Sequence, residues 1–255
     1  HASKRTLARL LDAGVRVVPA TGRARAGHWT SHVLTEPALR NGRPGIFLNG
    51  CTVYDEHGPL APATLDADIS ASVLELAEAQ RSCAIAYFKD EALHDSDSPM
   101  IARLEEVGDA PLRRVPSLRA ACAGLAITKV LLLTSGGGGG GDDATLDELR
   151  SLYGGAVGAA ASMTSALPWM AEVMPPGVSK ATAAAELLSR WGVRPDEALA
   201  IGDGENDLEI MGLVGTSIAM ANGGEAVRAA ADYQAPSNAE DGWSAAMERH
   251  VLGLL

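Results

Sequence analysis

Short apolar runs alternate with amphipathic stretches along most of the chain, and this alternation predicts the order of its elements. Leucines recur at helical spacing between positions 7 and 11, and Gly14 stands where a glycine commonly ends a helix. The apolar run 15–20 predicts a short buried strand, and a second short strand is expected at 46–48. The chain is therefore expected to open with one helix followed by two strands.

The alternation becomes strict in the last third of the chain. Helices are predicted over 179–191 and 224–231, with a last helix from about 241, because apolar residues recur there at helical spacing. Buried strands are predicted over 198–201 and 216–220. Helices that alternate with buried strands indicate an α/β fold with a doubly wound, Rossmann-like parallel sheet, whose ligands bind at the carboxyl ends of the strands.

The middle of the chain has a different texture and is interpreted as an inserted α/β domain. Its predicted helices are 65–80, 98–106 and 145–153. Its predicted strands are 84–88 and 127–133. The glycine run 136–141 is predicted to be a flexible linker, since no Gly-Lys-Ser/Thr follows it as in a phosphate-binding loop. The expected organisation is a core domain formed by 1–52 and 173–255, interrupted by the inserted domain 53–172.

Composition and charge narrow the expected partners. Hydrophobic residues make up 47% of the chain and charged residues 21%, as in globular proteins. The 21 Lys and Arg residues against 32 Asp and Glu residues give a formal charge of -11, which disfavours nucleic acid and anionic membranes as partners. No apolar run approaches the roughly 20 residues that cross a bilayer. Three widely spaced cysteines predict neither a disulfide framework nor a zinc site.

Three polar clusters stand where predicted strands end or predicted helices begin. They are Thr21-Gly22-Arg23, Ser179-Lys180, and Gly-Asp-Gly-Glu-Asn-Asp at 202–207. A hydroxyl and backbone N–H groups after a strand can hold phosphate oxygens, a lysine at a helix start adds positive charge, and paired carboxylates can bind Mg²⁺. Together the clusters predict a site for phosphoryl transfer.

Each cluster also has a purely structural explanation. The residues of 202–207 are typical of a turn followed by an N-capped helix. Thr21 would satisfy backbone groups of its own loop. Lys180 would be an ordinary lysine in a first helical turn, although a cation there is disfavoured by about 0.3 to 1 kcal/mol, so that an anion nearby would explain it.

The order of the three clusters resembles the haloacid dehalogenase superfamily. The matching stretches are 17–23 (Val-Val-Pro-Ala-Thr-Gly-Arg), 177–180 (Gly-Val-Ser-Lys) and 201–208 (Ile-Gly-Asp-Gly-Glu-Asn-Asp-Leu). More narrowly, the chain resembles the Cof-type sugar and metabolite phosphatases, which carry a large α/β cap after the second core strand. Supporting stretches are Phe-Leu-Asn-Gly at 47–50, Ala-Met-Ala-Asn at 219–222, and Ser-Asn-Ala-Glu-Asp-Gly at 237–242.

The resemblance implies which residues would contact the phosphate. Thr21 and Gly22, with Arg23 in the same loop, would bind the transferring phosphoryl group, and Lys180 would neutralise its charge. Asn206 would act at the phosphate or at a metal-bound water. Thr21, Lys180 and Asn206 are therefore the expected catalytic residues within this chain.

The resemblance also implies a metal site and a substrate pocket. Asp203 would bind Mg²⁺ with the help of Asp207, and Asn49 and Asn222 would border the pocket. The expected substrate is a small phosphorylated metabolite, with a sugar phosphate favoured. The chain leaves the oligomeric state open.

The motif that would begin the reaction is absent from the 255 residues. In the family, an Asp in an Asp-x-Asp-Gly-Thr motif attacks phosphorus and forms an aspartyl-phosphate. The Asp-x-Asp pairs at 66–68 and 95–97 lack the Gly-Thr and favour a helix cap and a polar loop. We therefore expect the nucleophile upstream of His1, and no turnover by these residues alone. The expected compartment is the cytoplasm, with an organelle as the alternative because a targeting segment would also precede His1.

Three other interpretations compete with a phosphatase. A P-type ion-pumping ATPase shares Gly-Asp-Gly-x-Asn-Asp, but it needs apolar spans and reads Thr-Gly-Asp where this chain reads Thr-Gly-Arg. A non-catalytic binding or regulatory protein would keep the scaffold without the nucleophile. A phosphomutase would move phosphate within a sugar instead of releasing it. Product analysis separates a phosphomutase from a phosphatase.

Overall fold

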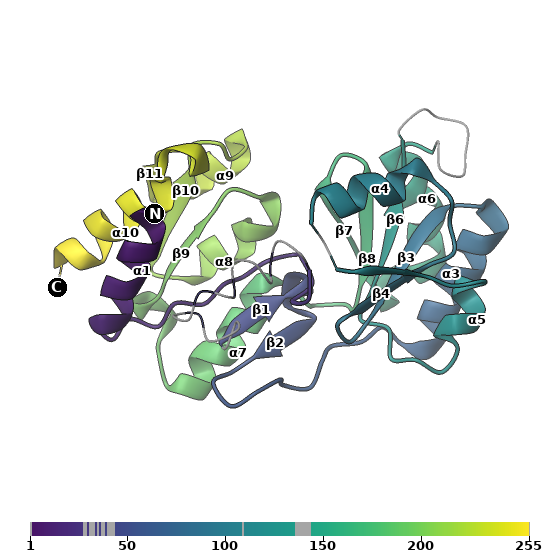
Figure 1. Cartoon of the computed structure of the whole chain (residues 1–255), viewed down its shortest axis with the longest axis horizontal. Helices are drawn as coiled ribbons and strands as arrows, with labels where there is room; N and C mark the ends of the chain where they lie inside the picture. The colour runs from purple at the N-terminus through teal and green to yellow at the C-terminus, as the bar shows by residue number, and fades with distance from the viewer. Residues whose placement is uncertain are drawn as a thin grey trace. The chain divides into compact units, whose positions relative to one another are not determined.

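The computed structural model describes residues 2–27, 30, 34, 36, 39, 44–108, 110–135 and 144–254. The chain forms two compact units, whose elements are labelled in Figure 1. The first unit comprises His1–Thr21, Leu34–Leu60 and Ser179–Leu255, and the second comprises Gly22–Val33 and Ala61–Val178. The domain limits expected at 52 and 172 stay a prediction.

A parallel three-stranded sheet forms the centre of the first unit. Its strands are β9 (Leu199–Gly202), β10 (Thr216–Met220) and β11 (Tyr233–Ala235), in the order β11-β10-β9. Helix α1 (Ala2–Asp12) packs against α10 (Gly242–His250), and Leu10, Ile218 and Met247 belong to the same buried cluster. Among the described residues, β9 pairs with β10 on one edge only.

Two further strands and three further α-helices in the described residues belong to the first unit. They are β1 (Gly45–Phe47), β2 (Thr52–Tyr54), α7 (Lys180–Trp191), α8 (Leu208–Leu213) and α9 (Glu225–Ala230). Strands β1 and β2 form an antiparallel pair. Helix α7 contributes Ala183, Ala184 and Leu187 to a cluster that contains Ile46 of β1. This packing places the first turn of α7 beside the loop that follows β1.

The strand predicted over 15–20 is not formed, and that prediction was wrong. The run makes a single parallel bridge, between Ala20 and Ile46. Its side chains still alternate, since Val15 and Val17 pack with the cluster of Leu10 while Val18 and Ala20 pack with that of Ile46. The run is therefore extended, but a strand also requires a hydrogen-bonded neighbour. Strand β1 is only three residues long, and proline at position 19 has no N–H to donate.

A six-stranded sheet with helices packed on it forms the second unit. Its strands are β3 (Cys83–Phe88), β4 (Glu91–His94), β5 (Leu112–Arg114), β6 (Lys129–Leu133), β7 (Ser162–Leu167) and β8 (Met170–Met174). Their order is β5-β4-β3-β6-β8-β7, antiparallel except for the pair β4 and β5. Its helices are α3 (Ala67–Gln80), α4 (Pro99–Glu106), α5 (Leu118–Cys122) and α6 (Leu146–Val157).

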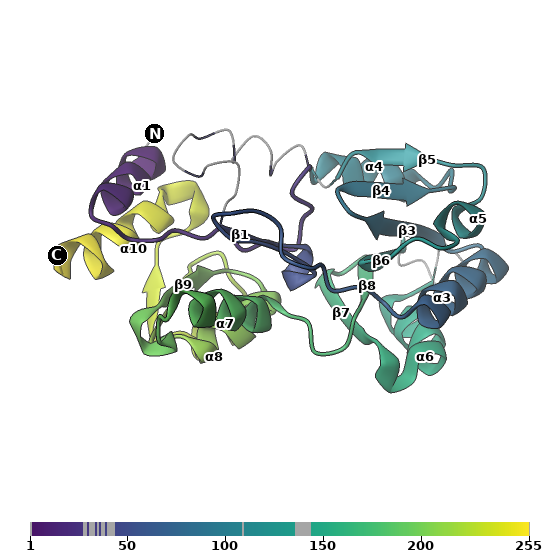
Figure 2. The ribbon, with the colours of Figure 1, turned by 90° about the horizontal axis from the view of Figure 1, so that it is seen from below.

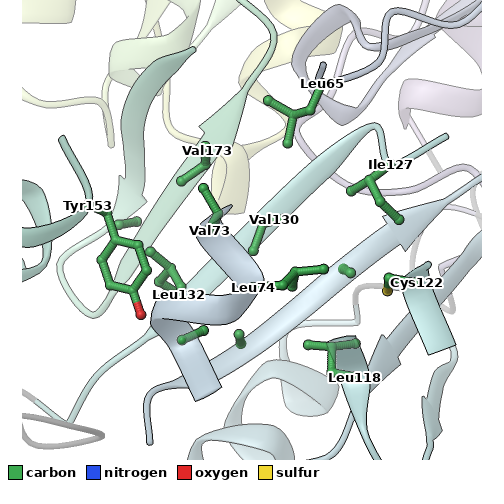
Figure 3. Close-up of a cluster of buried hydrophobic side chains, with 14 of the residues drawn as sticks. Leu65, Val73, Leu74, Leu118, Cys122, Ile127, Val130, Leu132, Tyr153 and Val173 are labelled. Carbon is green, nitrogen blue, oxygen red and sulfur yellow. The ribbon is translucent and has the colours of Figure 1, made fainter. Parts of the chain in front are cut away.

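The core of the second unit lies between its sheet and helices α3 and α6, which Figure 2 shows on the same face. Val73 and Leu74 of α3 point toward the side chains of the strands in Figure 3. Val130 and Leu132 of β6 belong to this core, so the alternate residue Leu131 faces the opposite side of the sheet.

Most of the predicted elements are confirmed to within a few residues. The helices predicted at 65–80, 98–106, 145–153 and 179–191 correspond to α3, α4, α6 and α7. Asp66 caps α3 by accepting the N–H of Asp68, as expected of that Asp-x-Asp pair. The α/β class is confirmed, whereas the glycine run 136–141 lies outside the described residues. No helix in the described part of the chain combines the length and apolar character needed to cross a membrane.

The link between β10 and the start of β11 generates a prediction about pH. Both the N–H and the Oγ of Ser217 donate to Asp232 Oδ2 at 2.8 Å, and these bonds hold the pKa of Asp232 below its ordinary value. A lowered carboxyl pKa stabilises the fold above the unfolded-state pKa, and this stabilisation is lost as the pH falls through the folded-state value. We expect Asp232→Ala to lower the melting temperature at pH 7, and the difference from wild type to shrink below about pH 4. Thermal unfolding followed by circular dichroism across this range checks it, and a difference that grows on acidification contradicts it.

Candidate functional site

The carboxyl ends of β9 and β10 carry two of the predicted site residues. Asp203 directly follows β9, and Asn222 lies just beyond β10, so the parallel pairing brings both to the same edge of the sheet. Asn222 Nδ2 donates to Asp203 Oδ2 at 2.6 Å, and Asn222 Oδ1 accepts the N–H of Asn238 at 2.9 Å. The loops after β9, β10 and β11 are thereby tied together around an exposed Asp203 carboxylate.

The turn at 202–207 closes around the carboxylate of Asp207. Its Oδ2 accepts the backbone N–H groups of Asp203 and Gly204, each at 3.1 Å. A Cβ atom at position 202 would overlap the Asp207 carboxylate, so the close approach requires glycine there. The turn thus has the structural role that its composition predicts, and its last carboxylate is buried.

Lys180 is the first residue of α7 and its side chain is buried. Ser179 caps this helix, with its Oγ accepting the N–H of Thr182 at 3.3 Å. Lys180 Nζ donates to Asp207 Oδ1 at 2.6 Å, and the two side chains are only 5% and 12% exposed. The anion that would explain a cation at the helix N-terminus is therefore present within the chain.

Asn49 connects two of the predicted catalytic residues. Its N–H donates to the carbonyl of Thr21 at 3.1 Å, and its Oδ1 accepts Asn206 Nδ2 at 2.9 Å. Asn49 is buried and lies in the left-handed region, with φ 55° and ψ 28°, a conformation that asparagine tolerates better than most residues. Three segments far apart in the sequence thus meet at Asn49, which uses its backbone N–H for one contact and its side chain for the other.

Gly22 and Arg23 are held by contacts within the second unit. The carbonyl of Gly22 accepts Lys129 Nζ at 3.1 Å, and Arg23 Nε donates to the carbonyl of Val107 at 3.1 Å. The structure therefore joins Thr21, Asn49 and Asn206. A second chain of hydrogen bonds runs from Lys180 through Asp207 and Asp203 to Asn222. The phosphate-binding roles of Gly22 and Arg23 stay predictions.

The donor set fits Mg²⁺ as part of a site. Mg²⁺ in proteins is commonly bound by one or two carboxylates, with waters and phosphate oxygens completing the shell. Asp203 is exposed and offers such a carboxylate, whereas both oxygens of Asp207 already accept hydrogen bonds. In the part of the chain that is described, no cluster of three or more His, Cys, Asp or Glu residues is placed to hold a metal. A cation here would thus depend on oxygen ligands beyond these two residues.

Sequence reasoning missed Lys129, whose ammonium contacts the loop that follows Thr21. The signal was present, because a lysine within the apolar run 127–133 places a charge in a strand expected to be buried. A buried charge of this kind requires a partner, which the sequence did not identify.

Comparison with known proteins identifies the family. A family model described as haloacid dehalogenase-like hydrolase matches residues 1–247. The chain belongs to this family. The fold of this haloacid dehalogenase-like chain is also that of a subclass IIB sugar phosphatase of the same superfamily, with a TM-score of 0.83 at 18% identity, covering 100% of this chain and 92% of the other. The family model confirms the expected haloacid dehalogenase superfamily, and the structural likeness to the subclass IIB phosphatase concerns the fold.

Two curated relatives of this haloacid dehalogenase-like chain carry different names. The chloroplastic endoribonuclease YBEY of Arabidopsis thaliana is 31% identical over 261 residues, covering 99% of this chain and 43% of that protein. A 5-amino-6-(5-phospho-D-ribitylamino)uracil phosphatase of Escherichia coli is 46% identical over 67 residues, covering 26% of this chain and 25% of that protein. The chain spans less than half the length of either relative.

Truncation of the two aspartates of the turn is expected to change the stability of the protein by very different amounts. Asp207→Ala leaves the Lys180 ammonium buried without its partner, and breaking such a pair typically destabilises a protein by about 3 to 5 kcal/mol. Asp203→Ala removes an exposed side chain with one hydrogen bond and is expected to change stability by less than about 1 kcal/mol. Urea unfolding of both variants tests this, and equal losses of stability contradict the assignment.

Proposed function

We propose that the protein is a Mg²⁺-dependent phosphatase acting on a small phosphorylated metabolite, with a sugar phosphate favoured. One observation carries the proposal: a buried lysine, an exposed aspartate and two amides belong to loops and a helix start at the carboxyl ends of parallel strands. That is where α/β sheets bind ligands, and these groups suit a phosphate dianion accompanied by a cation. Family membership supports hydrolysis as the type of reaction.

Each candidate catalytic residue of the chain has a distinct role in the proposed reaction. The hydroxyl of Thr21 would donate a hydrogen bond to a phosphoryl oxygen. The backbone carbonyl of Thr21 already accepts the N–H of Asn49. Lys180 would bring positive charge to that group while Asp207 fixes the position of its ammonium. Asn206, oriented by its bond to Asn49, would contact the phosphate or a bound water. These contacts would position the substrate and reduce repulsion between anions as the reaction begins.

Asp203, with Asp207 beside it, would hold Mg²⁺. Bound Mg²⁺ would supply charge neutralisation at the phosphoryl oxygens. The bond from Asn222 directs Asp203 without removing its exposure to solvent. Asn49 and Asn222 would border the substrate.

The nucleophile is proposed to be an aspartate upstream of His1. Its carboxylate would form a bond to phosphorus as the bond from phosphorus to the leaving alcohol breaks, and water would then hydrolyse the aspartyl-phosphate to free phosphate. Two observations on the described residues support a strand in that segment. Strand β9 pairs on one edge only, and the extended run 15–20 makes one bridge.

Ribonuclease activity is disfavoured as the function of this chain. The relative named an endoribonuclease is more than twice the length of the matched part, so its name describes a larger protein. The formal charge of -11 also opposes binding to a polyanion.

The test compares two polypeptides in a screen of phosphate esters for release of inorganic phosphate. The natural protein, extended upstream of His1, is expected to release phosphate only with Mg²⁺, and the 255 residues alone are expected to release none, because they contain no Asp-x-Asp-Gly-Thr. Turnover by the 255 residues alone would refute the upstream nucleophile. Transfer of phosphate within the substrate, without release, would indicate a phosphomutase.

In the extended protein, Asp203→Ala is expected to lower kcat/KM by at least about a hundredfold at a fixed Mg²⁺ concentration, since removing one electrostatic stabiliser of charge commonly has an effect of this size. Glu209→Ala, an exposed carboxylate in α8, is the matched control and is expected to keep full activity. Isothermal titration with Mg²⁺ should show weaker binding by Asp203→Ala alone. Unchanged activity in Asp203→Ala would overturn the metal assignment.

A further inference from the structure

A second buried ion pair lies in the second unit, on the face of the sheet opposite helices α3 and α6. Lys129 Nζ and Glu172 Oε1 are 3.1 Å apart, and the two side chains are 1% and 2% exposed. The register of β6 and β8 pairs Leu131 with Glu172, so Lys129 is the diagonal neighbour of Glu172 on the same face. The alternate residues Val130 and Val173 face the apolar core.

The surroundings of this pair fix the position of the ammonium group. Glu172 Oε2 accepts the hydroxyl of Thr164 at 3.4 Å, which orients the carboxylate from the neighbouring strand β7. Tyr87, the partner of Lys129 in β3, places its ring centroid 4.8 Å from the ammonium. A charge held by a carboxylate, a ring and two strands has little freedom to move.

The same ammonium donates to the carbonyl of Gly22 at 3.1 Å. Gly22 directly follows Thr21, and β6 is 107 residues away in the sequence. Because the peptide group is planar and trans, fixing the direction of the Gly22 carbonyl also fixes the Arg23 N–H, which points the opposite way. Lys129 thereby determines how the peptide after Thr21 and Gly22 is oriented.

We propose that Lys129, held by Glu172, is a positioning residue for the Thr21-Gly22-Arg23 loop. The proposal rests on the proposed function, in which this loop binds the phosphoryl group. A carbonyl turned toward a phosphate would repel it, whereas an N–H turned toward it would bind. Anchoring the carbonyl of Gly22 on a buried ammonium keeps the loop in one of these two orientations before substrate arrives.

The energetics of buried pairs suggest which variants to compare. Removing Lys129 alone would take away the counter-charge of the buried Glu172 carboxylate, a change that commonly destabilises a protein strongly. Replacing both charges with apolar side chains of similar volume is often neutral or stabilising. The double variant Lys129→Met/Glu172→Met is therefore expected to fold while lacking the donor to Gly22. Thr164→Val is the matched control, since it alters the same cluster but keeps the ammonium.

The experiment measures amide hydrogen exchange and phosphate binding in the natural protein that contains this chain. In the double variant, peptides covering 19–27 are expected to exchange at least tenfold faster, while peptides from α3 and β6 remain protected. The dissociation constant for inorganic phosphate with Mg²⁺ is expected to rise at least fivefold. Thr164→Val should match wild type in both measurements. The single variant Lys129→Arg keeps a charged donor and should therefore keep the slow exchange of the loop.

The outcomes separate this inference from the proposed function. Unchanged exchange over 19–27 in the folded double variant would overturn the positioning role, whatever the protein binds. Faster exchange with unchanged phosphate affinity would overturn the link between the loop orientation and phosphate. If wild type binds no phosphate, the proposed function fails, and the exchange result then decides the positioning role by itself.

Discussion

The carboxylate of Asp207 is the group on which the geometry of the candidate site depends. One oxygen neutralises the buried ammonium of Lys180, and the other receives the N–H groups of Asp203 and Gly204. A buried charge without a partner is strongly destabilising, so the start of α7 and the turn after β9 constrain each other. The requirement for glycine at 202 follows from the same packing.

Two buried ion pairs occur among the described residues, one in each unit, and they resemble each other. In each pair a lysine and an acidic residue are almost excluded from water, at separations of 2.6 Å and 3.1 Å. Such pairs contribute little net stability because desolvation offsets their attraction, and they are better explained by the positions that they specify. Lys180 occupies the N-terminus of a helix, and Lys129 reaches a loop carbonyl. One ammonium group thus contacts the carboxylate that closes the turn after β9, and the other contacts the loop that follows Thr21. The proposed reaction needs both segments in fixed places.

The sequence was most informative where structure depends on local periodicity. Helix α7 and strands β9 and β10 were predictable because the apolar spacing lies within each element, and the serine cap and the closing Gly192 directly flank the helix. The run 15–20 shows where prediction from local periodicity fails. Its side chains alternate as in a strand, but the hydrogen bonds of a strand depend on neighbours elsewhere in the chain. The strands β7 and β8 were missed because polar residues interrupt their apolar positions, among them the buried Glu172.

The residue types of the site were predictable, but the division of labour between them was not. Positions 203 and 207 are both aspartate, and the sequence analysis predicts that both bind the metal. Burial distinguishes them, because a carboxylate enclosed by an ammonium and two N–H groups has its charge already compensated. An exposed carboxylate with one amide neighbour retains the capacity to attract a cation. The buried aspartate therefore holds the backbone of the turn in place, and the exposed one is the residue to which the proposed function assigns the metal.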